Sequence, residues 1–128
     1  MIEKYLGMPY DIRNESGVNC WGLYSLVMMN ECGINKGNYV AGNAKEAAAV
    51  FAAKLATGEH GLTEVKTPKD YDLVLTESVS GAKKWHCGVY FKGSVLHAKG
   101  SSKSGQVWYD TLSDFVGGWK MGFWRDNS

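Results

Sequence analysis

The sequence predicts an α+β fold in which N-terminal helices pack on a C-terminal antiparallel β-sheet. In the first half of the 128-residue chain, apolar residues recur at helical spacing. In the second half, short runs rich in valine and aromatic residues are separated by glycine, serine and lysine, as in antiparallel strands. Helices followed by strands, without regular alternation, favour helices on one face of a sheet. The length suits a single domain over residues 1–128.

The first expected helix begins at Cys20. Residues 1–16 carry glycine, proline, asparagine and serine among isolated apolar residues, which predicts a short helix or arm and then a loop. Within residues 23–27 the apolar side chains recur at helical spacing, and Asn19 is a favourable N-cap. Gly33 supplies a stop signal, so we expect the helix to end before it.

The second expected helix covers residues 44–56. Asn43 followed by Glu46 resembles a capping box, and the alanine-rich run AKEAAAVFAAKLA ends before Gly58. Beyond Pro68 the periodicity changes, and we expect strands at the runs DLVL, WHCGVYF, SVLHA, GQVWY and GFW. These runs would form the antiparallel sheet.

The composition argues against several classes of function. The formal net charge is +1, so no broad positive field favours a nucleic-acid partner. The longest apolar stretch, Leu23 to Met29, is far short of the about 20 residues that cross a bilayer, so we expect no membrane insertion. The N-terminus lacks the features of a secretory signal, so the chain is expected to be made in the cytoplasm, alone or as part of something larger. No zinc-ligand spacing or nucleotide-binding glycine loop occurs, so no metal or cofactor is expected.

The three cysteines do not form a disulfide framework, so their interest lies in reactivity. Cys20 falls in the first turn of the expected helix, where unpaired backbone amides and the helix dipole stabilise a thiolate. Such a position lowers a thiol pKa from about 8.5 towards 7 or below. The alternative is that Cys20 is an inert, small apolar residue. Cys32 and Cys87 are expected to be structural, with Cys87 pointing into the core from the strand face opposite to His86.

Two of the three histidines, His86 and His97, lie in neighbouring expected strands. A hairpin loop of two or four residues pairs positions whose numbers sum to an odd value, as 86 and 97 do, so both side chains would share one face. Cys20 is then the nucleophile, and His86 is its general base and ion-pair partner. His97 would orient His86 by accepting a hydrogen bond from its second ring nitrogen. The alternative is that either histidine is an ordinary core or surface residue, and we assign no role to His60.

The ordered segments MPYDIRNESGVNCWGLYSLV, DYDLVLTE, WHCGVYF, SVLHA and GFWR resemble the NlpC-type cysteine peptidases, small papain-like enzymes that cut cell-wall peptides. The resemblance covers most of the chain. It is strongest to the branch found in phage tail-tip assembly proteins, in which the nucleophile is followed by Trp-Gly-Leu. It implies a papain-like fold with Cys20 as nucleophile, His86 as base and His97 as the third polar residue. It also implies that the Cys20 amide helps to form an oxyanion hole and that Tyr10 borders the active site.

The resemblance implies a cysteine endopeptidase that acts on peptidoglycan stem peptides as part of a phage tail, with other tail proteins as partners. Two positions depart from the family pattern. Asn19 stands where many members have aspartate, and Trp21 stands where wall-trimming members have a serine that binds the substrate's free amine. Trp21 is still a candidate substrate-binding or oxyanion residue because it follows the nucleophile. Two alternatives stay open: a non-catalytic tail structural or wall-binding module with the same fold, and a thiol amidase or acyltransferase.

Overall fold

The structure is a computed structural model that describes residues 2–11, 17–37, 58, 61–77, 85–99, 105–116 and 120–127. A 3₁₀ helix, η1 (Ile2–Tyr5), precedes α1 (Cys20–Val27), which continues as a π-helical turn, η2 (Met28–Cys32). A short helix, α3 (Leu112–Val116), follows late in the chain. The expected helix over residues 44–56 and His60 lie outside the described residues. None of the helices in the described part of the chain is long and apolar enough to span a membrane.

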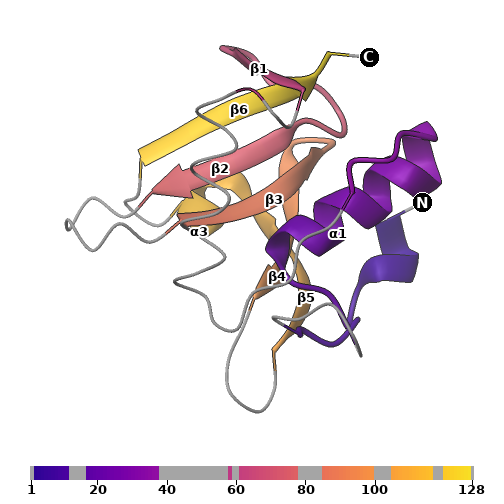
Figure 1. Cartoon of the computed structure of the whole chain (residues 1–128). Helices are drawn as coiled ribbons and strands as arrows, with labels where there is room; N and C mark the ends of the chain where they lie inside the picture. The colour runs from indigo at the N-terminus through magenta and orange to yellow at the C-terminus, as the bar shows by residue number, and fades with distance from the viewer. Residues whose placement is uncertain are drawn as a thin grey trace.

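Six strands form one antiparallel sheet. They are β1 (Leu62–Val65), β2 (Leu73–Glu77), β3 (Trp85–Phe91), β4 (Ser94–Lys99), β5 (Gln106–Thr111) and β6 (Lys120–Asp126). Their order in the sheet is β1-β6-β2-β3-β4-β5, so the C-terminal strand lies between β1 and β2 (Figure 1). Every neighbouring pair is antiparallel, which confirms the sheet predicted for the second half of the chain.

The sequence pattern does not predict β1, because its residues show no alternation of apolar and polar side chains. Leu62 is its only buried residue. The strand is defined instead by its pairing with β6, where Leu62 lies opposite Asp126 and Val65 opposite Phe123. A partner so far along the chain leaves no trace in the local sequence.

Helix α1 forms as its capping residues predict. The side chain of Asn19 accepts a hydrogen bond from the Gly22 amide at 2.7 Å. At the other end, Gly33 adopts a φ of 69°, and its amide donates to the Met29 carbonyl at 3.1 Å. A left-handed residue of this kind is the usual stop of a helix, so both ends are encoded locally.

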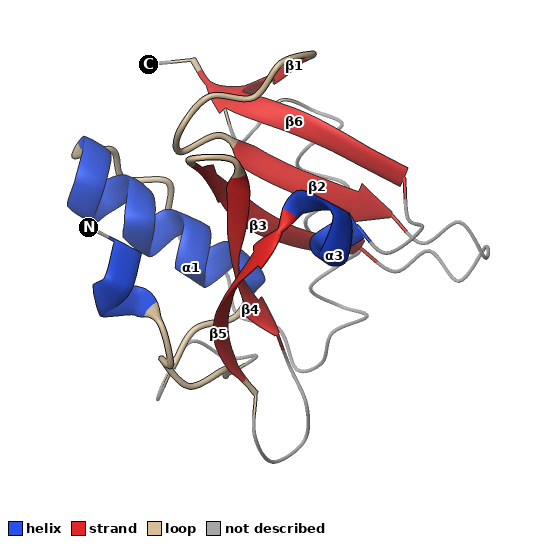
Figure 2. Cartoon of the chain, turned by 180° about the vertical axis from the view of Figure 1, so that it is seen from behind, coloured by secondary structure: helices blue, strands red, loops and turns tan. Residues whose placement is uncertain are grey.

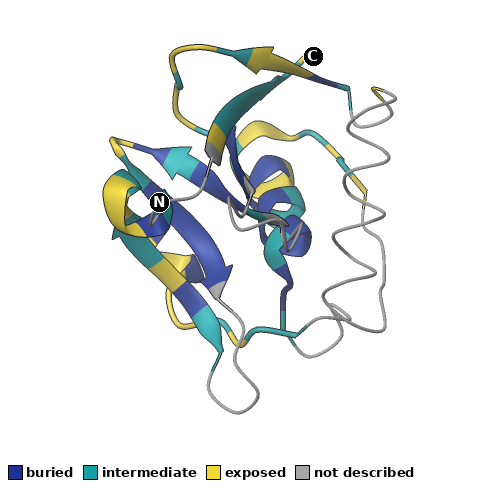
Figure 3. Ribbon diagram, turned by 90° about the vertical axis from the view of Figure 1, so that its left-hand side faces the viewer, coloured by how far each residue is buried: buried dark blue, intermediate teal, exposed yellow. Residues whose placement is uncertain are grey.

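The sheet buries side chains on both faces. On one face α1 packs against β3 and β4, and its buried residues join a core with those of the strands: Trp21, Leu23, Tyr24, Val27, Leu73, Leu75, Cys87, Val89, Leu96 and Ala98. On the other face a smaller cluster of Val74, Val95 and Phe115 involves α3, which faces the viewer in Figure 2. Figure 3 shows the buried residues concentrated on α1 and the central strands.

The observed architecture is therefore a small α+β protein with one six-stranded antiparallel sheet. The expected packing of helices on one face holds for α1, whereas α3 packs on the opposite face. The sequence does not predict α3, because its five residues are too few to show a helical period.

Candidate active site

Cys20 is the first residue of α1, and the preceding segment places it there. A parallel bridge joins Tyr10 to Val18, and the capping residue Asn19 is only 2% exposed. At the first helical position the backbone N–H has no acceptor within the helix, so the positive end of the helix dipole lies at Cys20. The Cys20 side chain itself is partly buried and packs against the core between α1 and the sheet, here called the α1-side core.

The hairpin of β3 and β4 brings the two histidines together. Its two turn residues, Lys92 and Gly93, have φ angles of 47° and 86°, as a tight type I′ hairpin turn requires. The resulting register puts His86 and His97 on one face, a diagonal step apart, as the odd sum of their residue numbers predicts. The Nε2 atom of His86 lies 3.1 Å from the Nδ1 atom of His97.

The two strands diverge beyond the turn, at the level of the histidines. The ladder between β3 and β4 covers only the residue pairs next to the turn. His86 instead pairs with Thr76 of β2, whose hydroxyl donates to the His86 carbonyl at 3.1 Å. His97 pairs with Trp108 of β5. Helix α1 contacts both diverging strands, and its N-terminal end lies beside them (Figure 1).

The pKa of the Cys20 thiol is held well below its ordinary value. The largest cause is a hydrogen bond from the Cys87 side chain, followed by the hydrogen bond and positive charge of His86; burial opposes both. The pKa of Cys87 moves the other way, because its thiol gives a hydrogen bond to Cys20 and is buried. Of this pair, Cys20 is therefore the thiol whose ionisation is favoured, and Cys87 is the hydrogen-bond donor.

Cys87 thus differs from the purely structural residue that the sequence predicts. It is 1% exposed and lies in the α1-side core, on the strand face opposite to His86, as expected. Because Cys20 packs against that same core, the two cysteines meet. Cys32, also expected to be structural, is exposed at the end of η2 and has no part in this cluster.

Asp110 is a further member of the site that the sequence analysis does not identify. Its Oδ2 atom lies 2.7 Å from Nε2 of His97, so Cys20, His86, His97 and Asp110 form one continuous chain of polar groups. In the register of β4 and β5, Asp110 is one diagonal step from His97 on the same face. The register of β4 and β5 would have identified Asp110 as a site residue. The loop between the two strands, however, does not allow this register to be predicted from the sequence.

Phe115 of α3 covers the histidine pair. Its ring centroid lies 5.3 Å from that of His86 and 4.9 Å from that of His97, the latter edge to face. His97 is only 4% exposed as a result. An apolar cover of this kind excludes water and strengthens the hydrogen bonds beneath it.

Tyr10 and Trp21, the two flanking residues named from the sequence, differ in their placement. Tyr10 is partly buried and packs against the same core as Cys20, and its pKa is raised by burial and then by the negative charge of Cys20. Trp21 is 1% exposed and donates its indole N–H to the Gly37 carbonyl at 3.1 Å. The side chain of Trp21 is therefore part of the core, which leaves its backbone for the substrate-binding or oxyanion role that the sequence predicts.

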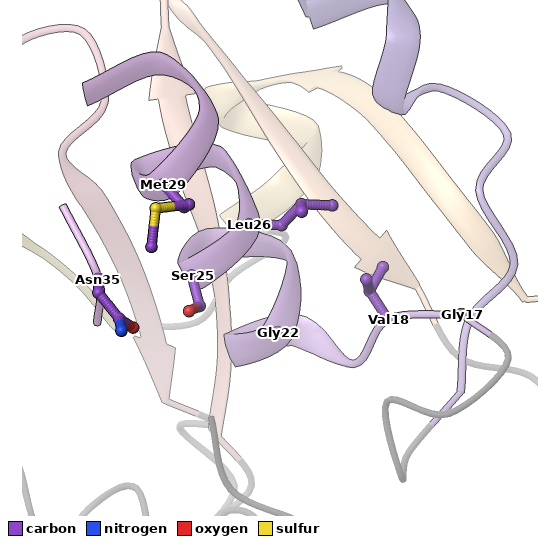
Figure 4. A pocket seen from close by; sticks show the side chains of 7 residues that line it. All are labelled: Gly17, Val18, Gly22, Ser25, Leu26, Met29 and Asn35. Carbon is purple, nitrogen blue, oxygen red and sulfur yellow. The ribbon is translucent and has the colours of Figure 1, made fainter. Parts of the chain in front are cut away.

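A hollow of about 240 Å³ lies along the outer side of α1 (Figure 4). Its lining residues are Gly17, Val18, Gly22, Ser25, Leu26, Met29 and Asn35. The helical members are spaced three and four apart and so share one face of α1, whereas Tyr24 and Val27 are buried on the sheet side with Cys20. Cys20 does not line this hollow.

Within the described ranges, no group of three or more histidine, cysteine or acidic side chains is arranged to hold a metal ion. No protein-family profile matches the chain, and no curated protein sequence matches it. The chemistry of the site accordingly follows from its geometry. A thiolate at a helix N-terminus, next to an imidazole that a second imidazole and a carboxylate support, is suited to nucleophilic attack on an acyl carbon.

Proposed function

We propose that this chain is a cysteine endopeptidase with a papain-like, NlpC-type fold that hydrolyses an amide bond in peptidoglycan stem peptides. The observations that carry the proposal are the pairing of His86 with His97, whose Nε2 and Nδ1 atoms lie 3.1 Å apart, and the position of Cys20 as the first residue of α1, where His86 helps to lower its pKa. A nucleophile, a base and a residue that orients the base are the three parts of a covalent acyl-transfer site.

The first half of the reaction uses the Cys20–His86 pair. The Cys20 thiolate attacks the amide carbonyl carbon while His86 holds the proton taken from the thiol. The tetrahedral intermediate collapses when His86 gives this proton to the leaving nitrogen, which breaks the C–N bond and leaves a thioester on Cys20. The backbone N–H of Cys20, at the positive end of α1, is placed to stabilise the oxyanion.

The second half releases the acyl group. His86 accepts a proton from water as the water oxygen attacks the thioester carbonyl. The C–S bond then breaks, the second peptide fragment leaves as a carboxylic acid, and Cys20 returns as a thiolate beside protonated His86. His97 holds the plane of the His86 ring through both halves, because its hydrogen bond uses the nitrogen that does not face Cys20.

The substrate class is supported by the resemblance of the cysteine and histidine segments to the NlpC-type peptidases. The Trp-Gly-Leu that follows Cys20 favours the phage tail-tip branch, so we place the enzyme in a virion tail, beside other tail proteins, where it would open the cell wall. The buried indole of Trp21 does not replace the serine that binds a free amine in wall-trimming members. A substrate that lacks a free amine next to the cleaved bond fits this site better.

The test is mass spectrometry of soluble products after purified sacculi from several bacteria are incubated with the protein. We expect new stem-peptide fragments with the wild type and at least a hundredfold fewer with Cys20→Ala, because removal of a catalytic nucleophile costs several orders of magnitude in rate. Cys32→Ala is the matched control, since it removes an exposed thiol outside the cluster, and it should match the wild type.

Equal fragment release by wild type and Cys20→Ala would contradict the mechanism. No release from any wall, together with Cys20 unreactive towards iodoacetamide below pH 8, would favour a structural or wall-binding tail module. No release with a reactive Cys20 would favour a thiol amidase or acyltransferase that acts on another acyl compound.

A further inference from the structure

We propose that Asp110 is a positioning residue that fixes where the protons sit on His97 and His86, so that His86 presents an unprotonated nitrogen to the Cys20 thiol. This inference rests on the proposed role of Cys20 as a nucleophile that His86 activates. It concerns a residue outside the cysteine and the two histidines of the proposed mechanism.

The placement of Asp110 makes this possible. The three strands β3, β4 and β5 are neighbours in the sheet, and each contributes one polar side chain to the same face. Each contact joins two residues that are diagonal neighbours on adjacent strands. His86 Nε2 lies 3.1 Å from His97 Nδ1, and His97 Nε2 lies 2.7 Å from Asp110 Oδ2. The second distance is typical of a charge-assisted hydrogen bond.

The hydrogen bonds that link Asp110, His97 and His86 determine the tautomers of the two histidines. A carboxylate only accepts hydrogen bonds, so Asp110 requires His97 to carry a proton on Nε2. Neutral His97 then has no proton on Nδ1, which accepts from Nε2 of His86. Neutral His86 is left with an unprotonated Nδ1, the nitrogen that does not face His97. That nitrogen is the one available to take the proton of Cys20.

The same arrangement serves after the proton moves. Protonated His86 donates from both ring nitrogens, to His97 on one side and to the Cys20 thiolate on the other. His97 does not need to change its tautomer between the two states. The carboxylate of Asp110 also stabilises the positive charge on the histidine pair, so loss of that carboxylate should raise the pH at which Cys20 becomes a thiolate.

The carboxylate of Asp110 contacts the pair through Nε2 of His97. Phe115, from α3, covers both rings with an apolar side chain. The titratable group that acts on His86 from α1 is the thiol of Cys20, whereas the thiol of Cys87 lies on the opposite face of β3. Asp114, also on α3, is exposed. The Asp110 side chain is 36% exposed, so it can be replaced without opening the core.

The test measures the rate of Cys20 alkylation by iodoacetamide against pH, with Cys20 identified by peptide mass. All proteins carry Cys32→Ala so that the exposed thiol does not consume reagent. The variants are Asp110→Asn, which keeps the shape but no longer requires a proton on Nε2 of His97, and Asp110→Glu, which restores a carboxylate. Asp114→Asn is the matched control, because it removes the same charge from a nearby exposed position.

We expect Asp110→Asn to move the alkylation profile by about one pH unit towards higher pH, so that the rate at pH 6 falls about tenfold. Asp114→Asn should leave the profile unchanged, and Asp110→Glu should recover part of the shift. A profile for Asp110→Asn that matches the wild type would overturn the proposal, as would equal shifts for Asp110→Asn and Asp114→Asn. A lower melting temperature with an unchanged profile would show a merely structural role. Because iodoacetamide is the probe, the result is independent of whether peptidoglycan is the substrate.

Discussion

At the scale of single residues, Cys20 depends on two neighbours of different chemistry. His86 supplies a positive charge when it is protonated and a proton acceptor when it is neutral. Cys87 supplies a buried S–H donor and, through its backbone, a second hydrogen bond. A hydrogen bond to the charged form of a group lowers the pKa of an acid, so both neighbours favour the thiolate. The larger of the two effects comes from the thiol of Cys87.

Replacement of Cys87 by valine should therefore raise the pKa of Cys20. Valine cannot donate a hydrogen bond, so the fraction of thiolate at pH 6 should fall, and alkylation of Cys20 by iodoacetamide there should slow about tenfold for each unit of pKa. Cys87→Ser is the matched control, because its hydroxyl still donates, and its profile should stay close to that of the wild type. Equal shifts in the two variants would mean that packing, and not the donor, sets the pKa of Cys20.

At the scale of elements, the pairing of β3 with β4 depends on a close approach at Gly88. A Cβ atom at this position would lie 2.5 Å from Cγ1 of Val95, 2.8 Å from the Leu96 carbonyl oxygen and 3.1 Å from Cβ of His97. The carbonyl oxygen is backbone and cannot move without a shift of β4. Glycine here lets the strands approach closely at the end of their ladder, just before they diverge.

Gly88→Ala should push the two strands apart and disturb His97. We expect a loss of about 1–3 kcal/mol in the free energy of unfolding, the usual cost of overpacking, together with slower alkylation of Cys20 at pH 6. Gly122→Ala in β6 is the matched control, because its added Cβ would meet the end of a flexible side chain, Glu64 Oε2, at 3.2 Å. If the two variants had equal stability in a urea titration, the close approach would not matter.

At the scale of the whole molecule, the C-terminal strand ties distant parts of the chain together. β6 lies between β1 and β2, and two ion pairs join it to other segments. Lys36, after η2, pairs with Asp126, and both side chains are less than a tenth exposed. Arg125 pairs through two nitrogens with Asp72, at 3.0 and 2.8 Å. The α1 segment and the loop before β2 are thus fixed to the last strand.

Lys36→Met should destabilise the whole fold, because it leaves the buried carboxylate of Asp126 without this partner. We expect a loss of about 3–5 kcal/mol in the free energy of unfolding, measured by urea titration. Lys4→Met is the matched control: Lys4 pairs with Glu31 at 2.9 Å, but its side chain is 53% exposed, so its removal should change stability far less. Similar losses in the two variants would argue against a role for burial.

Features of the site that depend on local sequence were predictable. The Asn19 cap, the start of α1 at Cys20 and the stop at Gly33 each depend on residues within a turn of one another. The shared face of the two histidines follows from a two-residue hairpin turn, whose effect on register is also local. In such cases the interacting residues are close in the chain, so spacing alone decides the geometry.

Only the tertiary structure decided the rest. Asp110 joins the site through the register of β4 and β5, and Cys87 meets Cys20 because α1 packs on that face of β3. The side chain of Trp21, a candidate substrate-binding or oxyanion residue, is buried in the core. Each of these outcomes depends on contacts between residues far apart in the chain. By itself, then, the sequence determined the helix that begins at Cys20 and the shared strand face of His86 and His97. Long-range packing decided which further groups surround them, because periodicity indicates the face on which a residue lies and not its distant neighbours.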